Sequence, residues 1–274
     1  MSTSISASFL TQWSSDVFVA YQRQGSLLRG TVREQMINPG ETAKFHKYGT
    51  GAVGARGQHG LVPVMNATHS VVSVTVSDYY GGEYIDDLDT LKTNIDERLL
   101  AANALAAAAG RKVDERIIAV AGTSVPAANQ IALAATGFTK TKALKLVFLR
   151  FQQDIPEDGQ TFALIGAQQW ADLLDIPEFK SRDYMTSLPW TQGYAAASWL
   201  GITWIMHTGL TVASLQRTCL AWHRPAMGLA MVADLRPNFD WIAERAAYFS
   251  QVRISMEAVS IEDNGRFSFI CQEV

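Results

Sequence analysis

Apolar residues at helical spacing mark the clearest element of the chain. Between residues 85 and 109 they recur on one face, at Leu88, Leu91, Ile95, Leu99, Ala102, Leu105 and Ala109. Asp86, Asp87 and Asp89 lie at the start of this stretch, and Arg111 and Lys112 follow it, as the helix macrodipole favours. The pattern predicts a helix over 85–109, about 38 Å long at about 1.5 Å per residue, which is long enough to cross a domain.

A different pattern precedes this helix. Residues 31–37 have an extended character, Asn38-Pro39-Gly40 is a turn signal, glycines crowd residues 49–60, and residues 70–76 are rich in β-branched side chains. We expect a long two-stranded excursion with a glycine-rich tip. A tip of this length has no core of its own, and such loops are usually functional or disordered.

The amino-terminal 29 residues carry apolar side chains spaced by three and four. They are Phe9, Leu10, Trp13, Val17, Phe18 and Tyr21. This spacing predicts a short amphipathic helix that needs an apolar surface to lie on.

Beyond the long helix, the pattern predicts a mixed α/β region with its own core. Helices are expected at 113–121, 140–153 and 167–174, and buried strands at 161–165 and 202–207. Weaker helical patterns cover 224–233 and 238–248. Near the carboxyl end, two alternating segments flank Asn264-Gly265, a sequence typical of a type I′ turn, and this predicts a β-hairpin.

Composition narrows the class of protein. The 274 residues are 48% hydrophobic and 18% charged, which suits one large or two modest globular domains and excludes intrinsic disorder. The net charge is −3 without a run of five like charges, so tight nucleic-acid binding is not expected. The two cysteines form no CxxC motif and suit a reducing compartment. We expect neither secretion nor a membrane span, because the longest apolar run, 195–206, is short.

Three groups of residues resemble reactive sites, and each has a simpler explanation. Residues 49–54 match GxGxxG, a dinucleotide-binding fingerprint, but Gly57, Gly60 and Pro63 occupy the place of the helix that the fingerprint requires. Asp86, Asp87 and Asp89 resemble a metal site, or they are acids at a helix start. The three residues Cys219, His223 and His207 are soft-metal ligands or core residues. We therefore predict no catalytic, cofactor or metal site, and no enzyme.

The order of elements resembles a known family. The strand from Val71, the sequence Asp78-Tyr79-Tyr80, the acidic stretch 83–89, the helix to Ala109 and the segment 110–118 resemble tailed-phage major capsid (coat) proteins. Similar order continues through the 154–159 turn and the segment 193–204. The resemblance implies an α+β fold of the Hong Kong 97 type.

This resemblance implies a division of the chain into five parts. Residues 1–29 would be an amino-terminal arm and 30–77 an extended β-loop. Residues 78–126 would be a peripheral domain with the spine helix, and 127–222 an axial α/β domain. Residues 223–274 would return to the peripheral domain and end in the β-hairpin.

The resemblance also implies a function and partners. The chain would self-assemble, as hexamers and pentamers, into the icosahedral shell of a tailed phage around its double-stranded DNA, which it would contact weakly. Scaffolding, portal and decoration proteins would be further partners, with no membrane partner and no cofactor. The location would be the virion capsid, assembled in the host bacterial cytoplasm. A cellular nanocompartment shell of the same fold, and a nucleotide-binding α/β enzyme that uses Gly49–Gly54, remain alternatives.

Residues on the arm, the loop and the spine are the expected contacts between subunits. They are Trp13, Phe18, Tyr21, Lys44, His46, Lys47, Arg56, Asp86, Asp89 and Arg98.

Overall fold

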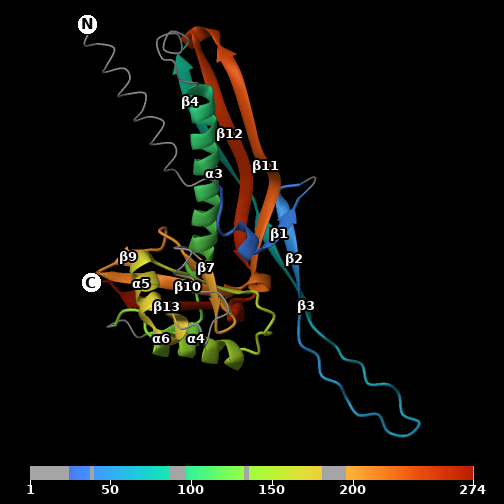
Figure 1. Ribbon diagram of the computed structural model, residues 1–274. Helices are drawn as coiled ribbons and strands as arrows, with labels where there is room; N and C mark the ends of the chain where they lie inside the picture. The colour runs from blue at the N-terminus through green and yellow to red at the C-terminus, as the bar shows by residue number, and fades with distance from the viewer. Residues whose placement is uncertain (1–24, 38–39, 87–96, 133–135, 181–195, 274) are drawn as a thin grey trace.

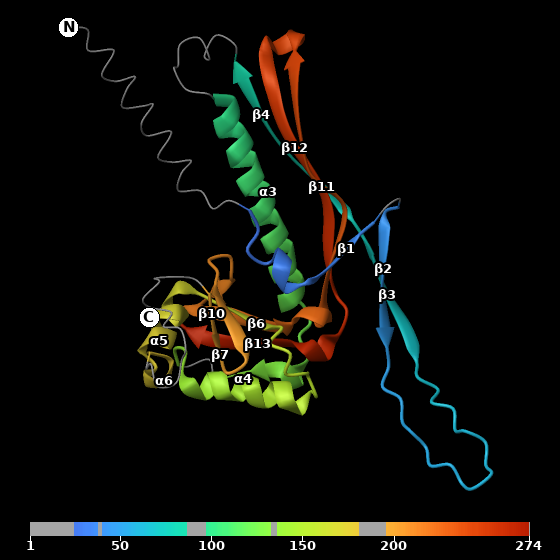
Figure 2. The same ribbon diagram turned by 45° about the vertical axis from the view of Figure 1, so that its right-hand side comes forward.

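The computed structural model describes residues 25–37, 40–86, 97–132, 136–180 and 196–273. Two sheets, one long helix and one projecting hairpin organise these residues (Figure 1). The long helix lies along a tall four-stranded sheet, a seven-stranded sheet with short helices lies at its foot, and the hairpin points away from both (Figures 1 and 2).

The four-stranded sheet combines strands from both ends of the chain. Its order is β1 (Arg33–Met36), β11 (Met227–Ile242), β12 (Ala247–Ser260) and β4 (Ser77–Asp86). Strand β1 runs parallel to β11, and the other neighbours are antiparallel. The helical patterns predicted over 224–233 and 238–248 are wrong, because the first lies largely in β11 and the second covers the end of β11, a short turn and the start of β12. Met227, Leu229 and Met231 alternate into the core, which is the strand period of two.

The long helix α3 (Glu97–Gly122) packs against β12 and β4. The prediction of a helix over 85–109 needs two corrections. Residues 85 and 86 end strand β4, and α3 continues through Gly110 to Gly122, so the separate helix at 113–121 is part of it. Position 110 inside α3 has to be glycine, because the backbone of Gly25 packs directly on it and any side chain would clash. Residues 87–96 lie outside the described residues.

The seven-stranded sheet has the order β5-β13-β10-β6-β8-β7, and β9 pairs with one end of β10. The strands are β5 (Gln130–Ile131), β6 (Thr161–Ile165), β7 (Ala196–Trp199), β8 (Ile202–Met206), β9 (Val212–Ala213), β10 (Gln216–His223) and β13 (Arg266–Gln272). Helices α4 (Lys140–Gln152), α5 (Ala167–Asp175) and α6 (Pro177–Lys180) accompany them. The helices predicted at 140–153 and 167–174 and the strands at 161–165 and 202–207 are confirmed.

The predicted carboxyl-terminal hairpin is wrong. Strand β12 pairs with β11 and β4, whereas β13 pairs with β10 and β5 in the other sheet. The residues between them form the short 3₁₀ turn η5 (Asp263–Gly265) instead of a type I′ turn. Residues 266–272 therefore belong to the seven-stranded sheet. Four other 3₁₀ turns are η1 (Arg29–Thr31), η2 (Ala127–Asn129), η3 (Arg224–Ala226) and η4 (Ala243–Arg245).

One core cluster joins both sheets and α3. It includes Ile117 from α3, Trp204 and Trp222 from the seven-stranded sheet, and Met231 and Met256 from the four-stranded sheet. The indole Nε1 of Trp222 donates a hydrogen bond to the Thr31 carbonyl at 3.1 Å. The two sheets are thus packed as one body. Among the described residues, no helix combines the length and the apolar character that crossing a membrane requires.

The predicted two-stranded excursion is confirmed as the antiparallel β2–β3 hairpin, formed by β2 (Thr42–Tyr48) and β3 (His69–Thr75). The preceding extended segment is not part of it, because β1 joins the four-stranded sheet. A second small core anchors the root of the hairpin. Ala43 and Phe45 of β2 pack there with Ile37 after β1, Ala230 of β11 and Ile261 after β12.

Candidate assembly surfaces

The β2–β3 hairpin and its tip carry positive charge only. Residues 42–77 contain no aspartate or glutamate, but they include Lys44, Lys47 and Arg56 and three histidines. The hairpin projects from the body (Figure 2). At its root, Lys47 pairs with Glu262 of the body. A cationic surface on an extension favours contact with an acidic surface.

The hairpin tip also exposes large apolar side chains. Val53 and Leu61 are 95% and 96% exposed, and Val62 and Val64 are exposed too. Contiguous exposed apolar residues are uncommon on monomeric proteins and mark interaction sites. The tip therefore has the surface of a contact region.

The GxGxxG match lies in this tip. Within residues 49–66 the structure has turns and irregular backbone, and no helix follows Gly54. The fingerprint needs a helix whose amino end faces the pyrophosphate. The geometry required for the nucleotide-binding alternative is therefore missing from this segment.

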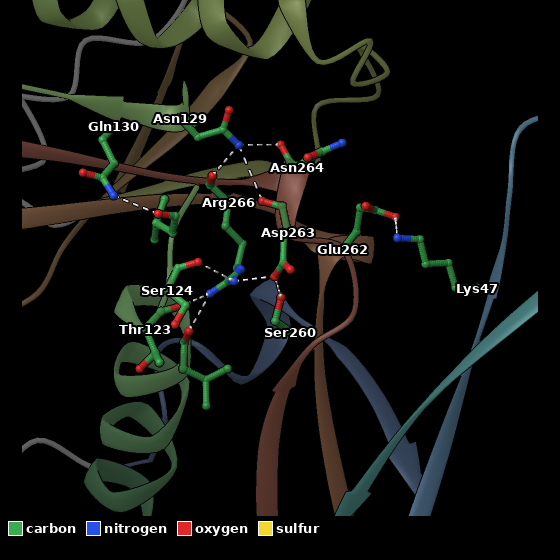
Figure 3. Close-up of polar contacts among 12 residues, drawn as sticks. Lys47, Thr123, Ser124, Asn129, Gln130, Ser260, Glu262, Asp263, Asn264 and Arg266 are labelled. Atoms are coloured by element: carbon green, nitrogen blue, oxygen red, sulfur yellow. Dashed lines mark hydrogen bonds and ion pairs between the residues drawn. The ribbon is translucent and has the colours of Figure 1, made fainter. Parts of the chain in front are cut away.

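An ion pair fixes the root of the hairpin to the body. Nζ of Lys47 lies 2.6 Å from Oε2 of Glu262, in the turn after β12 (Figure 3). Beside this pair is a cleft of ≈ 610 Å³ between the hairpin root and the body, lined among others by His46, Asp154 and His223. The hairpin thus meets the body at the point where the two sheets join.

A polar network around Arg266 holds that junction together (Figure 3). The buried Arg266 guanidinium donates hydrogen bonds to the carbonyls of Val120 and Thr123, at 2.9 and 2.7 Å, at the carboxyl end of α3. It also pairs with Asp263 at 2.5 Å. The Asn129 amide donates to the Arg266 carbonyl at 3.0 Å. One side chain therefore links α3 to the turn between the sheets.

The Asp263 carboxylate in this network is held in its charged form. Its pKa is lowered by the hydrogen bond from the Ser260 hydroxyl and by the neighbouring Arg266 guanidinium, which together outweigh burial. The negative charge therefore persists at neutral and mildly acidic pH.

A second buried carboxylate anchors the start of the described chain. Asp114 on α3 accepts hydrogen bonds from the Ser26 hydroxyl at 2.5 Å and the Leu28 amide at 3.1 Å. Its other oxygen accepts from the Leu27 amide at 3.2 Å and lies 3.3 Å from Nε2 of His207. Burial raises the pKa of Asp114, but the hydrogen bonds from these four groups lower it by more. The pKa therefore lies below its ordinary value. Residues 26–28 are therefore fixed to α3, and the same carboxylate links α3 to His207, directly after β8.

The far end of the four-stranded sheet is acidic and aromatic. Asp86 ends β4 there, and the Arg245 guanidinium lies 4.5 Å from the ring of Tyr84. Trp241 is exposed beside Tyr248, with ring centroids 4.8 Å apart. This end lies opposite the hairpin tip along the molecule (Figures 1 and 2).

The structure separates the residues predicted as contacts into different places. Lys44 and His46 are exposed on β2, Lys47 pairs with Glu262, and the Arg56 Nε donates to the Gly60 carbonyl in the tip. The contact residues at the hairpin and Asp86 are not brought together within one chain. Arg98 is in the first turn of the described part of α3, while Trp13, Phe18, Tyr21 and Asp89 lie outside the described residues.

The residues considered as metal ligands take separate partners. His207 pairs with Asp114, and Nε2 of His223 lies 3.0 Å from Asp158. The pKa of the buried Cys219 is raised by its contact with Cys271 and by burial, so it remains a thiol. Among the residues that the structure places, no three histidine, cysteine or acidic side chains gather as metal ligands. Asp87 and Asp89, the companions of Asp86, are outside that set.

Sequence reasoning missed the residues that organise the junction and the arm root. Glu262, Asp263 and Arg266 flank the turn signal Asn264-Gly265, and no pattern in the sequence indicates their partners, which lie more than a hundred positions away. Asp114 had a usable signal, because a lone carboxylate lies between Val113 and Ile117 on the apolar face of a helix. Such a residue needs a buried partner.

Comparison with known proteins agrees with this geometry. The model of the family described as phage capsid protein matches residues 5–273. No curated protein matches the sequence. The similar solved structures described below are 12–15% identical to this chain, so they show the fold alone.

Three of these structures illustrate the likeness. The capsid of the cyanophage P-SCSP1u has a TM-score of 0.68 at 15% identity, covering 92% of this chain and 90% of that one. The capsid of a native GTA particle has a TM-score of 0.69 at 12% identity, covering 92% and 93%. The structure of Mycobacterium phage Cain has a TM-score of 0.68 at 13% identity, covering 94% of each chain.

These findings establish the fold and the role of the chain. The α+β arrangement is the Hong Kong 97-type capsid fold, and the family is structural rather than enzymatic. Copies of such chains associate with one another in the assembled capsids. The chain belongs to the phage capsid protein family and is a major capsid protein, a structural component of the virion shell.

Proposed function

We propose that this chain forms hexamers and pentamers that close into an icosahedral shell around double-stranded DNA. The observation that carries the proposal is the β2–β3 hairpin, whose tip exposes Val53 and Leu61 almost completely. Nothing in the hairpin folds back onto the body beyond its root, so these side chains lose contact with water only if another subunit covers them (Figure 2).

The energy available from the tip suits a repeated weak contact. Burying Val53, Leu61 and Val64 contributes about 1.5 to 3 kcal/mol for each side chain. Association costs a comparable or larger amount in lost translational and rotational freedom, about 4 to 15 kcal/mol. A single hairpin contact is therefore weak, and stability comes from the many copies that each give and receive one.

The chain divides by role in this proposal. Residues 1–29 are the arm, and 30–77 contain the extended loop, although β1 within that range belongs to the four-stranded sheet. The arm and the β2–β3 hairpin lie over neighbouring copies. Residues 78–126 form the peripheral part with the spine, and 127–222 the axial part, with residues 266–272 added to its sheet. The remaining contacts proposed between copies are Trp13, Phe18, Tyr21, Lys44, His46, Lys47, Arg56, Asp86, Asp89 and Arg98. Scaffolding, portal and decoration proteins are the expected partners, and assembly takes place in the host bacterial cytoplasm.

Near-neutral charge supports DNA as the enclosed polymer. With a net charge of −3, the chain does not bind phosphates strongly, so packaged DNA is held by the wall rather than attached to it. Nuclease-resistant DNA inside purified particles is the expected result. Particles that contain protein cargo and no DNA would instead identify a nanocompartment.

Electron microscopy of expressed protein tests the shell directly. We expect closed shells from the natural chain, with a scaffold if one is required, and loss of shells from the triple variant Val53→Ser, Leu61→Ser, Val64→Ser. Met36→Ser, on β1, is the matched control because Met36 is also exposed but lies outside the hairpin. Since all four side chains are exposed, the melting temperature should stay unchanged in both variants. Normal shells from the triple variant would refute the role of the tip.

A further inference from the structure

Helix α4 has an apolar face on each side, and only one of them is buried. Ala143, Leu146 and Leu149 belong to the core. On the outward side, Leu144, Phe148 and Phe151 are 46%, 62% and 50% exposed. They occupy positions i, i+4 and i+7 and therefore form one continuous stripe, called here the α4 stripe.

Two buried cations prevent the helix from turning this stripe inward. Nζ of Lys142 donates to the Ile270 carbonyl at 2.8 Å, and the Arg150 guanidinium donates to the Gly201 carbonyl at 3.1 Å. Rotating α4 to bury Phe148 would pull both charges away from their acceptors. The helix lies on the side of the seven-stranded sheet that faces away from α3 (Figures 1 and 2). These bonds therefore keep the α4 stripe on the outer side of the helix.

The same sheet presents a second unusual apolar feature, the turn between β9 and β10. Ser214 and Leu215 both have left-handed backbone, with φ of 51° and 60°, although neither is glycine. Left-handed backbone costs about 1 to 2 kcal/mol for such residues, and strain of this kind gathers at functional positions. Leu215 is 69% exposed, and Val212 beside it is also exposed. Residues 212–215 are called here the β9–β10 tip.

The β9–β10 tip and the α4 stripe lie on different elements of the chain. The Glu273 amide donates to the Leu215 carbonyl at 2.7 Å, which places the tip beside the carboxyl terminus, at one end of β10. The stripe lies on the outer face of α4. One chain therefore carries a small apolar projection and, elsewhere, an apolar strip that spans about 10 Å along a helix at about 1.5 Å per residue.

We propose that the β9–β10 tip of one copy packs against the α4 stripe of the next copy. The contact joins two different surfaces, so it is head-to-tail, and repetition around an axis closes it into a ring. This inference rests on the proposed hexamers and pentamers and names the surfaces that join their members. Leu215, which is 69% exposed, is the side chain of the tip that packs against Phe148 and its neighbours Leu144 and Phe151.

Cysteine pairing across the contact tests this placement. In the double variant Leu215→Cys, Phe148→Cys, mild oxidation of assembled particles should give a ladder of covalent oligomers on a non-reducing gel, up to five and six chains. The natural Cys219 and Cys271 are buried and do not compete. Leu215→Cys, Glu115→Cys is the matched control, since Glu115 is an exposed position on α3. It should give at least tenfold less of the ladder.

A second variant tests the same contact without the use of cysteines. Leu144→Ser, Phe148→Ser should leave the melting temperature unchanged while lowering the fraction of chains in rings at least tenfold, as measured by analytical ultracentrifugation. Lys145→Ser, an exposed neighbour on α4, should leave that fraction unchanged. Particles that form normally without the ladder, or rings that survive the double serine variant, overturn the contact but leave the shell intact. If the natural chain forms no rings or shells at all, the proposed function itself fails.

Discussion

Nζ of Lys47 lies 2.6 Å from Oε2 of Glu262, so a strand of the β2–β3 hairpin is joined by charge to the turn that connects the two sheets. Both side chains are partly exposed, and pairs of this kind contribute about 0 to 1 kcal/mol. The pair therefore orients the hairpin more than it stabilises the fold.

Replacing Lys47 by methionine should loosen the hairpin root without unfolding the protein. We expect faster hydrogen exchange of the amides in β2 and β3, measured by mass spectrometry, and an almost unchanged melting temperature. Lys44→Met is the control, because Lys44 is exposed on the same strand. Equal exchange in the two variants would show that the ion pair does not hold the hairpin.

Replacing Asp114 by asparagine should destabilise the fold and release the arm root. The carboxylate accepts bonds from Ser26, Leu27 and Leu28, and an amide offers only one acceptor oxygen in its place. We expect a loss of about 2 to 3 kcal/mol in the free energy of unfolding, measured with urea. Glu115→Gln, at the exposed neighbouring position, should change it by less than about 0.5 kcal/mol.

The same carboxylate predicts a dependence on pH. The pKa of Asp114 in the folded protein is lower than its ordinary value, so the folded state binds fewer protons than the unfolded state. Its contribution to stability is therefore full above the ordinary carboxyl pKa, near about 4, and is lost as pH falls through the lower folded value. Urea denaturation of the natural chain and Asp114→Asn should give curves that converge at low pH, and a constant gap would contradict this.

Replacing Arg266 by methionine should weaken the junction between the sheets. The variant leaves the carbonyls of Val120 and Thr123 without their buried donor and Asp263 without its cation. We expect a loss of about 1 to 3 kcal/mol, because buried carbonyl acceptors lose their donor, whereas Asp263 is largely exposed and can be hydrated. Arg266→Lys should lose less, since one ammonium keeps the charge but cannot reach all the acceptors. The exposed Arg253→Met is the control, and urea denaturation is the measurement.

Replacing Phe45 by alanine should open the hairpin root. The ring is fully buried in the small core with Ile37 and Ile261. Removing it from a well-packed core costs about 3 to 5 kcal/mol. We expect a lower melting temperature and faster proteolysis within 49–66, whereas Tyr48→Ala, exposed on the same strand, should resemble the natural chain. Unchanged proteolysis would show that the root is held by other contacts.

Sequence patterns correctly predicted the elements whose hydrophobic period and ends are set by their own residues. Strand β3, helix α4 and strands β6 and β8 have a single period and clear ends, and the order of elements was enough to indicate the family. Gly110 shows where this reasoning fails. As an isolated glycine it suggested a helix end, but it is required inside α3 because Gly25, 85 positions earlier, packs on it.

The prediction of a carboxyl-terminal hairpin was wrong for a related reason. Asn264-Gly265 is a strong hairpin signal only when the flanking strands pair with each other. Here Arg266 is drawn to the end of α3, and β12 is occupied on both edges by β11 and β4. Contacts with residues that are distant in sequence therefore determine the conformation of this turn. The contacts of Asp114 and Glu262 could not be predicted for the same reason.

The passage of the chain between its two sheets has a mechanical consequence. Strand β10 leads into β11 through Arg224–Ala226, and β12 leads into β13 through Asp263–Gly265, so two covalent links lie side by side where the Ile261 amide donates to the Ala226 carbonyl. A force that stretches the molecule along its tall sheet is carried by backbone bonds in both links and loads the strands lengthwise. Many hydrogen bonds then resist together in shear instead of opening one after another, which suits the wall of a pressurised container.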